Sequence, residues 1–237
     1  MRNGLITLLA VVAALCSGLA VPSYAITNGG FETGNFSGWD TTGITSVIGS
    51  FAGGPTEGTS QARIETGDID PAAKSVLELE TFLGLSAGSL KGLGNGEPVN
   101  GSAIKQTFSA SLGDVLSFDW NFLTNENPLL PINDFSFVTL LSLSTLGSVT
   151  SSTLVPLGGD FNSHTGFQTF SAVIPSPGAY VLGLGVVNVD DDEVSSGLLV
   201  DNVTLTGDTS TAPEPGTLLL LGSGLVGLAF WRRQQPA

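Results

Sequence analysis

The chain has 237 residues, with 32 glycines, 12 prolines, one cysteine and only 12% charged residues. Seven Lys and Arg against 21 Asp and Glu give a net charge of −14, which would repel the phosphate backbone of a nucleic acid. A single cysteine excludes an internal disulfide, a thiolate zinc site and an iron–sulfur cluster. The hydrophobic content of 41% can fill a core, so the chain is not a disordered acidic tail.

The first 25 residues have the pattern of a secretory signal peptide. A basic residue near the start is followed by an apolar run from Leu5 to Leu19, and Ser23-Tyr24-Ala25 forms a small-x-small cleavage site. We expect export and cleavage after this tripeptide. A lipoprotein signal through Cys16 is the alternative, although Leu15 stands where a small residue should precede a lipidated cysteine.

Residues 26–206 are predicted to form one folded domain, which the polar linker 207–212 joins to a C-terminal segment. Between residues 26 and 212 there are four basic residues against 20 acidic ones, and none of the basic residues follows Lys105. The second half of the domain therefore presents carboxylates without side-chain counter-ions. Such a surface suits either an oxygen-loving divalent cation or a well-solvated exported protein.

Two segments at the ends of this domain have distinctive sequences. Asn28–Trp39 reads NGGFETGNFSGW and Leu199–Val203 reads LVDNV. They resemble the first and last strands of galactose-binding-like jelly rolls, a family that includes several carbohydrate-binding modules. The resemblance implies that these strands meet and that Glu32 and Asp201 bind a structural calcium ion, which prefers oxygen ligands. In the alternative interpretation Glu32 caps a turn and Asp201 hydrogen-bonds a loop.

Alternating apolar and polar residues indicate β-strands throughout the domain. The clearest case is Leu116–Phe122, in which four apolar side chains share one face. Residues 72–83 fit a short helix or a strand, and their alternation favours the strand. Segments of similar length, separated mostly by turn residues, are Ala103–Ala110, Phe135–Leu143, Phe167–Ile174, Ala179–Val187 and Leu198–Thr206. The predicted fold class is therefore all-β, a two-sheet antiparallel β-sandwich of the jelly-roll kind.

One of these strands has two very different faces. In Ala179–Val187, Gly183 and Gly185 alternate with large apolar residues. One face of the strand is therefore apolar, and the other is almost bare. Either a second layer of the structure approaches the bare face closely, or the surface there is flat.

The four adjacent acidic residues Asp190–Glu193 are predicted to form a solvated hairpin loop between Val189 and Val194. Neighbouring side chains of an extended chain point to opposite sides, so that the four carboxylates cannot all reach one ion. The spacing of an EF-hand loop is also absent. Asp190 and Asp192 nevertheless provide the alternative calcium site.

Signatures of catalysis are incomplete. Gly84-Leu85-Ser86-Ala87-Gly88 matches the Gly-x-Ser-x-Gly nucleophile motif by letters, but a Gly-rich run follows where that motif needs a helix. The only histidine, His164, lies in a polar turn, so a Ser/His/Asp triad has no spare base. We therefore predict that the protein is not an enzyme. An extracellular hydrolase of polysaccharide or ester is the alternative. The two catalytic carboxylates of a glycoside hydrolase converge from distant strands, so the letters of the sequence alone do not exclude such a pair.

Exposed aromatic rings could provide platforms for sugar binding. Trp120 and Tyr180 lie among apolar neighbours in alternating strands and are expected in the core. Trp39, in the turn Gly38-Trp39-Asp40, is the one candidate platform for a ligand. Packing beneath the first loop is the alternative for its side chain.

The C-terminal segment 213–237 has three parts in order. Pro213-Glu214-Pro215 is followed by the apolar run 216–231 and then by Arg232-Arg233. This order resembles the PEP-CTERM sorting signal of Gram-negative bacteria. The resemblance implies a transient membrane anchor, processing by exosortase and delivery to the cell surface or exterior. An ordinary membrane helix that stays in place is the alternative, although the run is shorter than the ~20 residues that span a bilayer.

These features predict an exported, non-catalytic protein of the cell surface or extracellular matrix. Its expected partners are the Sec export machinery, exosortase and an extracellular polysaccharide bound with low affinity. Its expected cofactor is structural Ca²⁺. Nucleic acid is not an expected partner.

Overall fold

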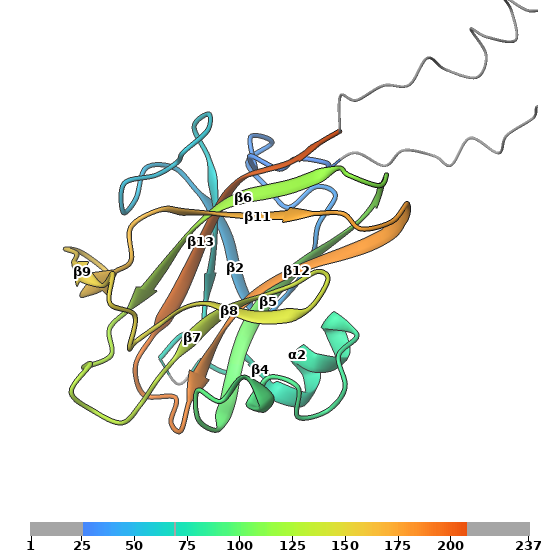
Figure 1. Ribbon diagram of the computed structural model, residues 1–237. Coiled ribbons are helices and arrows are strands. Elements are labelled where there is room, and N and C mark those ends of the chain that lie inside the picture. Colours follow the sequence, from blue (N-terminus) through green and yellow to red (C-terminus); the bar gives the residue numbers. More distant parts are fainter. Residues whose placement is uncertain (1–25, 69, 208–237) are drawn as a thin grey trace, which may run out of the picture.

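Two antiparallel β-sheets pack face to face in the computed structural model, which describes residues 26–68 and 70–207 (Figure 1). The first sheet has the order β1 (Asp40–Thr42), β5 (Pro98–Ala110), β12 (Gly178–Val189), β7 (Phe135–Thr139) and β8 (Leu143–Ser148), with β4 (Lys74–Ser75) also paired to β5. The second has the order β2 (Ile44–Ile48), β3 (Gln61–Glu65), β13 (Ser196–Thr206), β6 (Val115–Thr124), β10 (Ser163–His164) and β9 (Val155–Pro156), with β11 (Gln168–Val173) also paired to β6. The structure confirms the predicted two-sheet antiparallel sandwich.

Alternating apolar residues fill the space between the sheets. Leu116, Phe118, Trp120 and Phe122 of β6 are all buried there, as the alternation predicted. The other predicted strands also lie within or overlap observed strands. Only Phe135–Leu143 is divided, because residues 140–142 bend the chain between β7 and β8.

Residues 72–83 contradict the predicted strand. After the short strand β4, the chain forms the helix α2 (Val76–Leu83). The carboxylate of Glu78 caps its first turn by accepting hydrogen bonds from the backbone N–H (3.0 Å) and the hydroxyl (2.6 Å) of Ser75. Gly84, with a φ of 72°, ends the helix in the left-handed conformation. These two local signals outweigh the apparent alternation.

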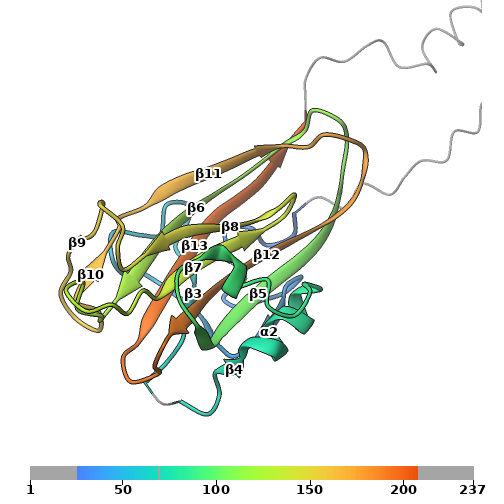
Figure 2. The same ribbon diagram turned by 60° about the horizontal axis from the view of Figure 1, so that its bottom comes forward.

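The helix α2 lies against the outer face of the first sheet, beside β5 (Figure 2). Leu79 and Leu83 are buried in this contact, four residues apart on one face of the helix. A Cβ atom added to Gly183 would stand 2.6 Å from Cδ2 of Leu83, which belongs to the helix. A second layer therefore does approach the bare face of β12.

The segment 28–39, expected to contain the first strand, is a series of turns. It touches the last strand through one backbone hydrogen bond, from the N–H of Val203 to the carbonyl of Gly29 (3.0 Å). The first observed strand, β1, pairs with β5 in the first sheet, whereas β13 belongs to the second sheet. The expected meeting of first and last strands is therefore wrong as strand pairing. The two ends of the described chain nevertheless lie near each other (Figure 1).

The predicted signal peptide (1–25), including Cys16, lies outside the described residues, as does the sorting segment (213–237) with Pro213-Glu214-Pro215 and Arg232-Arg233. Within the described ranges no helix is both long enough and apolar enough to cross a membrane. The domain boundaries assigned from the sequence stay a prediction.

Candidate functional site

Glu32 binds the loop that precedes β3, residues 56–60. Its carboxylate accepts the backbone N–H groups of Thr59 and Ser60, each at 2.8 Å, and the hydroxyl of Thr59 at 3.0 Å. These backbone hydrogen bonds, that of Thr59 first, hold the pKa of Glu32 below its ordinary value. Glu32 is therefore an anchor for this loop.

Asp201 binds the same loop from β13. Its Oδ2 atom accepts the N–H groups of Thr56 (2.6 Å) and Glu57 (2.9 Å), and its Oδ1 atom accepts the N–H of Asn202 (2.7 Å). Burial raises the pKa of Asp201, although these hydrogen bonds oppose the change. The structure thus brings the two predicted calcium ligands to one loop.

The donors around these two carboxylates do not fit a calcium site. Calcium takes roughly six to eight oxygen ligands, whereas Glu32 and Asp201 face N–H groups. These contacts favour the interpretation in which Glu32 caps a turn and Asp201 holds a loop. Calcium binding at this edge stays a prediction.

The acidic run Asp190–Glu193 lies in the hairpin loop between β12 and β13, as predicted. Asp190 has a left-handed φ of 67°, and its Oδ1 atom accepts the N–H of Glu97 at 3.3 Å. Oδ2 of Asp192 accepts a 3.5 Å hydrogen bond from the amide of Asn100. The two alternative calcium ligands thus contact different residues at the start of β5.

A buried carboxylate that no sequence pattern indicated, Asp134, directly precedes β7. It lies at the end of the sandwich where β12 turns into β13, which we call the hairpin end. Asp134 is 1% exposed, its Oδ1 atom accepts the N–H of Val189 (2.8 Å), and its Oδ2 atom accepts the hydroxyl of Ser196 (2.7 Å). Burial raises its pKa from 3.8 to about 7, and the negative charges of Glu126 and Asp191 contribute to the rise. Its only signal in the sequence is an acidic residue directly before an apolar strand.

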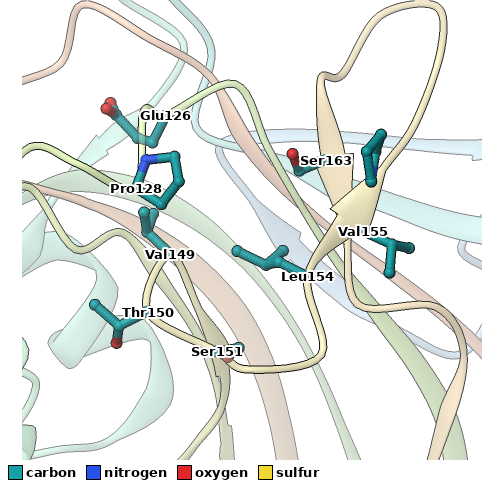
Figure 3. Close-up of a pocket in the computed structure, with 9 residues that line it drawn as sticks. Glu126, Pro128, Val149, Thr150, Ser151, Leu154, Val155 and Ser163 are labelled. Atoms are coloured by element: carbon teal, nitrogen blue, oxygen red, sulfur yellow. The ribbon is translucent and has the colours of Figure 1, made fainter.

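A pocket of about 460 Å³ lies between the segments that follow β6 and β8, and Glu126 is part of its wall (Figure 3). Glu126 is 5% exposed, and its carboxylate is turned away from Leu154 and Val155 (Figure 3). Burial raises the pKa of Glu126, and the charge of Asp191 raises it further. The other lining residues are apolar or carry hydroxyls: Pro128, Val149, Thr150, Ser151, Leu154, Val155, Pro156 and Ser163.

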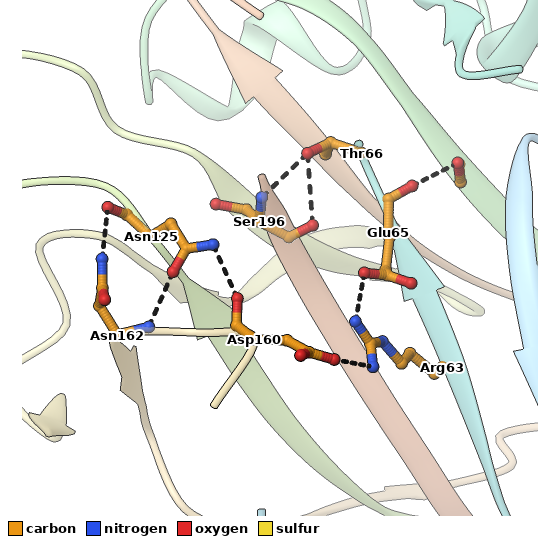
Figure 4. Close-up of polar contacts among 8 residues, drawn as sticks. Arg63, Glu65, Thr66, Asn125, Asp160, Asn162 and Ser196 are labelled. Carbon is orange, nitrogen blue, oxygen red and sulfur yellow. Dashed lines mark hydrogen bonds and ion pairs between the residues drawn. The ribbon is translucent and has the colours of Figure 1, made fainter. Parts of the chain in front are cut away.

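A group of polar contacts ties the chain before β10 to the second sheet (Figure 4). Arg63 of β3 donates hydrogen bonds to the carboxylates of Glu65 (2.6 Å) and Asp160 (3.0 Å). The amide of Asn125 donates to the carbonyl of Asp160 (2.9 Å) and accepts the N–H of Asn162 (2.8 Å). Both terminal nitrogens of the Arg63 guanidinium are therefore engaged within this group.

Trp39 packs beneath the first loop. It is 6% exposed, its ring centroid lies 5.4 Å from that of Phe31, and its Nε1–H donates to the carbonyl of Asn28 at 3.3 Å. The indole is therefore not exposed as the platform that the sequence suggested. Trp120 is buried as expected, and Tyr180 is half-buried against the core.

Ser86 and His164 belong to different layers of the structure. Ser86 lies in the loop after α2, where its carbonyl accepts the hydroxyl of Ser89 at 2.6 Å. His164 lies in β10, and its Nδ1 atom is 3.1 Å from Nδ2 of Asn121. Because an amide nitrogen only donates, Nδ1 is the acceptor and the ring proton is on Nε2. Burial lowers the pKa of His164. These contacts do not make a nucleophile–base pair of Ser86 and His164.

Residues 211–234 match the family model described as the PEP-CTERM protein-sorting motif. This match confirms the sorting signal that the sequence predicted. A comparison of the chain with curated proteins found no match.

Solved structures of carbohydrate-binding modules show a similar architecture at low identity. The chain is 13% identical to TmCBM61, solved in complex with beta-1,4-galactotriose, over 78% of this chain and 99% of that one, with a TM-score of 0.40. It is 13% identical to CBM28, described as specific for non-crystalline cellulose, over 78% and 96%, with a TM-score of 0.43. It is 14% identical to the CBM22-1–GH10 modules of Clostridium thermocellum xylanase 10B, solved with xylohexaose, over 80% and 30%, with a TM-score of 0.36.

Proposed function

We propose that the protein is an exported, non-catalytic β-sandwich of the cell surface or extracellular matrix, anchored transiently and processed by exosortase. The observation that carries this proposal is the sorting motif at residues 211–234, which begins a few residues after β13 ends at Thr206. The last strand of the sandwich therefore leads almost directly into the sorting segment. This arrangement suits a domain that is the cargo of that segment.

Two features support a non-catalytic role over an extracellular hydrolase. Ser86 and His164 lie in different layers, so that no nucleophile is paired with this base. Hydrolysis of a glycoside by paired acids requires two carboxyl groups that face one cleft. In the described pocket the wall carries one carboxylate, that of Glu126, and it is turned away from Leu154 and Val155 (Figure 3).

The pocket also supports binding of an extracellular polysaccharide with low affinity. Its wall combines the hydroxyls of Thr150 and Ser163 with the apolar side chains of Leu154 and Val155, which matches the mixed hydroxyl and C–H surface of a sugar. No aromatic ring lines it among the described residues, so that ring stacking adds nothing to the affinity. Because the chain has a net charge of −14, the ligand is expected to be neutral or cationic.

Intact-mass measurement of the surface fraction tests the sorting proposal. The wild-type protein should lack residues 1–25 and the segment after Pro213–Pro215. Glu214→Ala should keep the C-terminal segment and stay with the membrane, whereas the linker variant Asp208→Ala should be processed normally. A wild-type surface protein that retains residues 216–237 would contradict the proposal.

A glycan array with the exported protein tests the ligand proposal. Val155→Asp places a charge on the pocket wall and should reduce the binding of neutral glycans at least fivefold. Val173→Asp is the matched control, because Val173 is an exposed valine of β11 outside the lining of the pocket. Equal binding by the two variants would exclude the pocket, and a protein that binds no glycan would contradict this ligand class without affecting the sorting proposal.

A further inference from the structure

Two buried acceptor oxygens lie near the end of the sandwich where the hairpin between β12 and β13 turns. Within the described chain, Oε1 of Glu126 and Oδ1 of Asn188 receive no hydrogen bond. Glu126 is 5% exposed and Asn188 is 1% exposed. Folded proteins pair nearly all buried polar groups, because an unpaired buried acceptor loses its water without gaining a partner. Each of these two oxygens can therefore accept a further hydrogen bond or bind a cation.

The strand register brings these residues to the same end. Thr124, at the end of β6, pairs with Ser196 at the start of β13, and Glu126 follows two residues later. Asn188 is the penultimate residue of β12, directly before the hairpin loop. The backbone N–H of Asn125 also donates to the carbonyl of Ser195 at 3.0 Å. The chain after β6 and the hairpin are thus joined by a direct hydrogen bond.

Three carboxylates lie at this end of the sandwich, and in the described residues none of them forms an ion pair with Lys or Arg. The charge of Asp191 in the hairpin loop acts on Glu126, and both act on Asp134. In the described part of the chain, ion pairs involve Arg63 and Lys91 and reach none of these three carboxylates. Carboxylates that repel one another in this way favour the binding of a cation.

The available oxygens indicate the kind of cation. Both oxygens of Asp134 already accept hydrogen bonds from Val189 and Ser196, so Asp134 supplies nearby charge but no free ligand position. Oδ1 of Asp191 accepts the N–H of Glu193. Among the described residues, no hydrogen bond reaches Oδ2 of Asp191, so this oxygen can bind a cation. Carboxylate and amide oxygens are the ligands of hard cations such as calcium, whereas zinc prefers nitrogen and sulfur.

We propose that this end of the sandwich binds a divalent cation of the calcium class, with Glu126 and Asp191 as carboxylate ligands and the amide oxygen of Asn188 as a neutral ligand. Such a set contains two acidic side chains, so it agrees with the lack of any three metal-binding side chains around one point in the described residues. The site is separate from the Glu32 and Asp201 edge. Asp201 is five residues beyond Ser196 along β13, about 16 Å in an extended strand.

Calorimetric titration of the exported protein with calcium chloride, after removal of metals by a chelator, tests this proposal. The wild type should bind calcium, and Glu126→Gln and Asp191→Asn should each weaken the affinity at least tenfold. Asp40→Asn is the matched control, because Asp40 is an exposed acid at the edge of the first sheet and its loss removes the same charge. The control should bind calcium within twofold of the wild type.

Thermal unfolding in chelator separates this effect from misfolding. Glu126→Gln should unfold at no lower a temperature than the wild type, because it removes a buried charge that has no cationic partner. A lower midpoint in chelator would contradict the proposal, as would absence of calcium binding by the wild type. Unchanged calcium affinity in Glu126→Gln and Asp191→Asn would also overturn the proposal. Calcium binding that is lost only in Asp201→Asn would assign the ion to the edge of Glu32 and Asp201.

Discussion

The hydroxyl of Ser196 donates a 2.7 Å hydrogen bond to Oδ2 of Asp134, which joins the start of β13 in the second sheet to the residue that precedes β7 in the first. The other oxygen of Asp134 accepts the N–H of Val189 at the end of β12. One buried carboxylate thus connects three strands at the hairpin end. Because burial opposes its ionisation, the protonation of Asp134 should affect stability near neutral pH.

The free energy of unfolding of the wild type should fall as the pH rises from about 4 to about 7. Asp134→Asn should abolish this fall. The folded protein holds this proton up to a pKa of about 7, whereas the unfolded chain releases it near the ordinary value of 3.8. The folded state binds more protons in this window, so the free energy of unfolding falls as the pH rises and levels off above about pH 7. At ~1.4 kcal/mol for each pKa unit, the variant should gain roughly 1 to 4 kcal/mol relative to the wild type between these limits.

Urea unfolding in chelator at about pH 4, 6 and 8 measures this difference. Asp40→Asn is the control, since it removes the same charge from an exposed position at the edge of the first sheet. Parallel curves for the wild type and Asp134→Asn would show that Asp134 does not hold the proton.

Asp201→Asn should destabilise the protein by roughly 1 to 3 kcal/mol, and by the same amount in calcium and in chelator. The carboxylate accepts the N–H groups of Thr56 and Glu57, and an amide nitrogen in place of Oδ2 would face these donors. Thermal unfolding under both conditions checks this expectation. If calcium stabilises the wild type but not this variant, Asp201 is a calcium ligand. Its hydrogen bonds to the loop 56–60 would then not be its only role.

Gly185→Ala should destabilise the sandwich by roughly 1 to 3 kcal/mol. Its new methyl group would meet the ring of Phe137 at 2.5 Å and the carbonyl oxygen of Ser102 at 2.8 Å. Gly178→Ala on the same strand is the matched control, because the nearest atom to its Cβ lies at 4.0 Å. Chemical denaturation should separate the two variants, and equal midpoints would mean that the neighbouring strands β5 and β7 can yield to the added methyl group without cost.

Ser86→Ala should leave localisation, stability and glycan binding unchanged. The backbone carbonyl of Ser86 accepts the hydrogen bond from Ser89, and this contact does not involve the Ser86 hydroxyl. A serine-directed fluorophosphonate followed by peptide mass spectrometry provides the check. Stoichiometric labelling of Ser86 would contradict the non-catalytic assignment.

The strands could be predicted because their signal is local. In Leu116–Phe122 every second side chain is apolar, and the same side chains fill the core. The helix α2 was missed although Ser75 and Glu78 have the spacing of a capping box, which is also a local signal. The alternation of Leu77 and Leu79 with Glu78 and Glu80 concealed it.

The hairpin-end carboxylates could not be predicted in this way. Asp134 receives its hydrogen bonds from residues 55 and 62 positions away in the sequence, so its burial depends on which strands become neighbours. The same reason applies to Glu32 and Asp201. Their resemblance to known strand ends indicated that they act near one another, but their contact with the loop 56–60 depends on tertiary packing.

One end of the strand β13 leads to the sorting segment, and the other end lies close to the buried carboxylate of Asp134. It begins at Ser196, close to Asp134, and ends at Thr206, near the first described residues (Figure 1). Eleven extended residues span roughly 35 Å. Under the proposed anchoring of the chain beyond Thr206, this strand therefore separates the hairpin end from the point of attachment by about its own length.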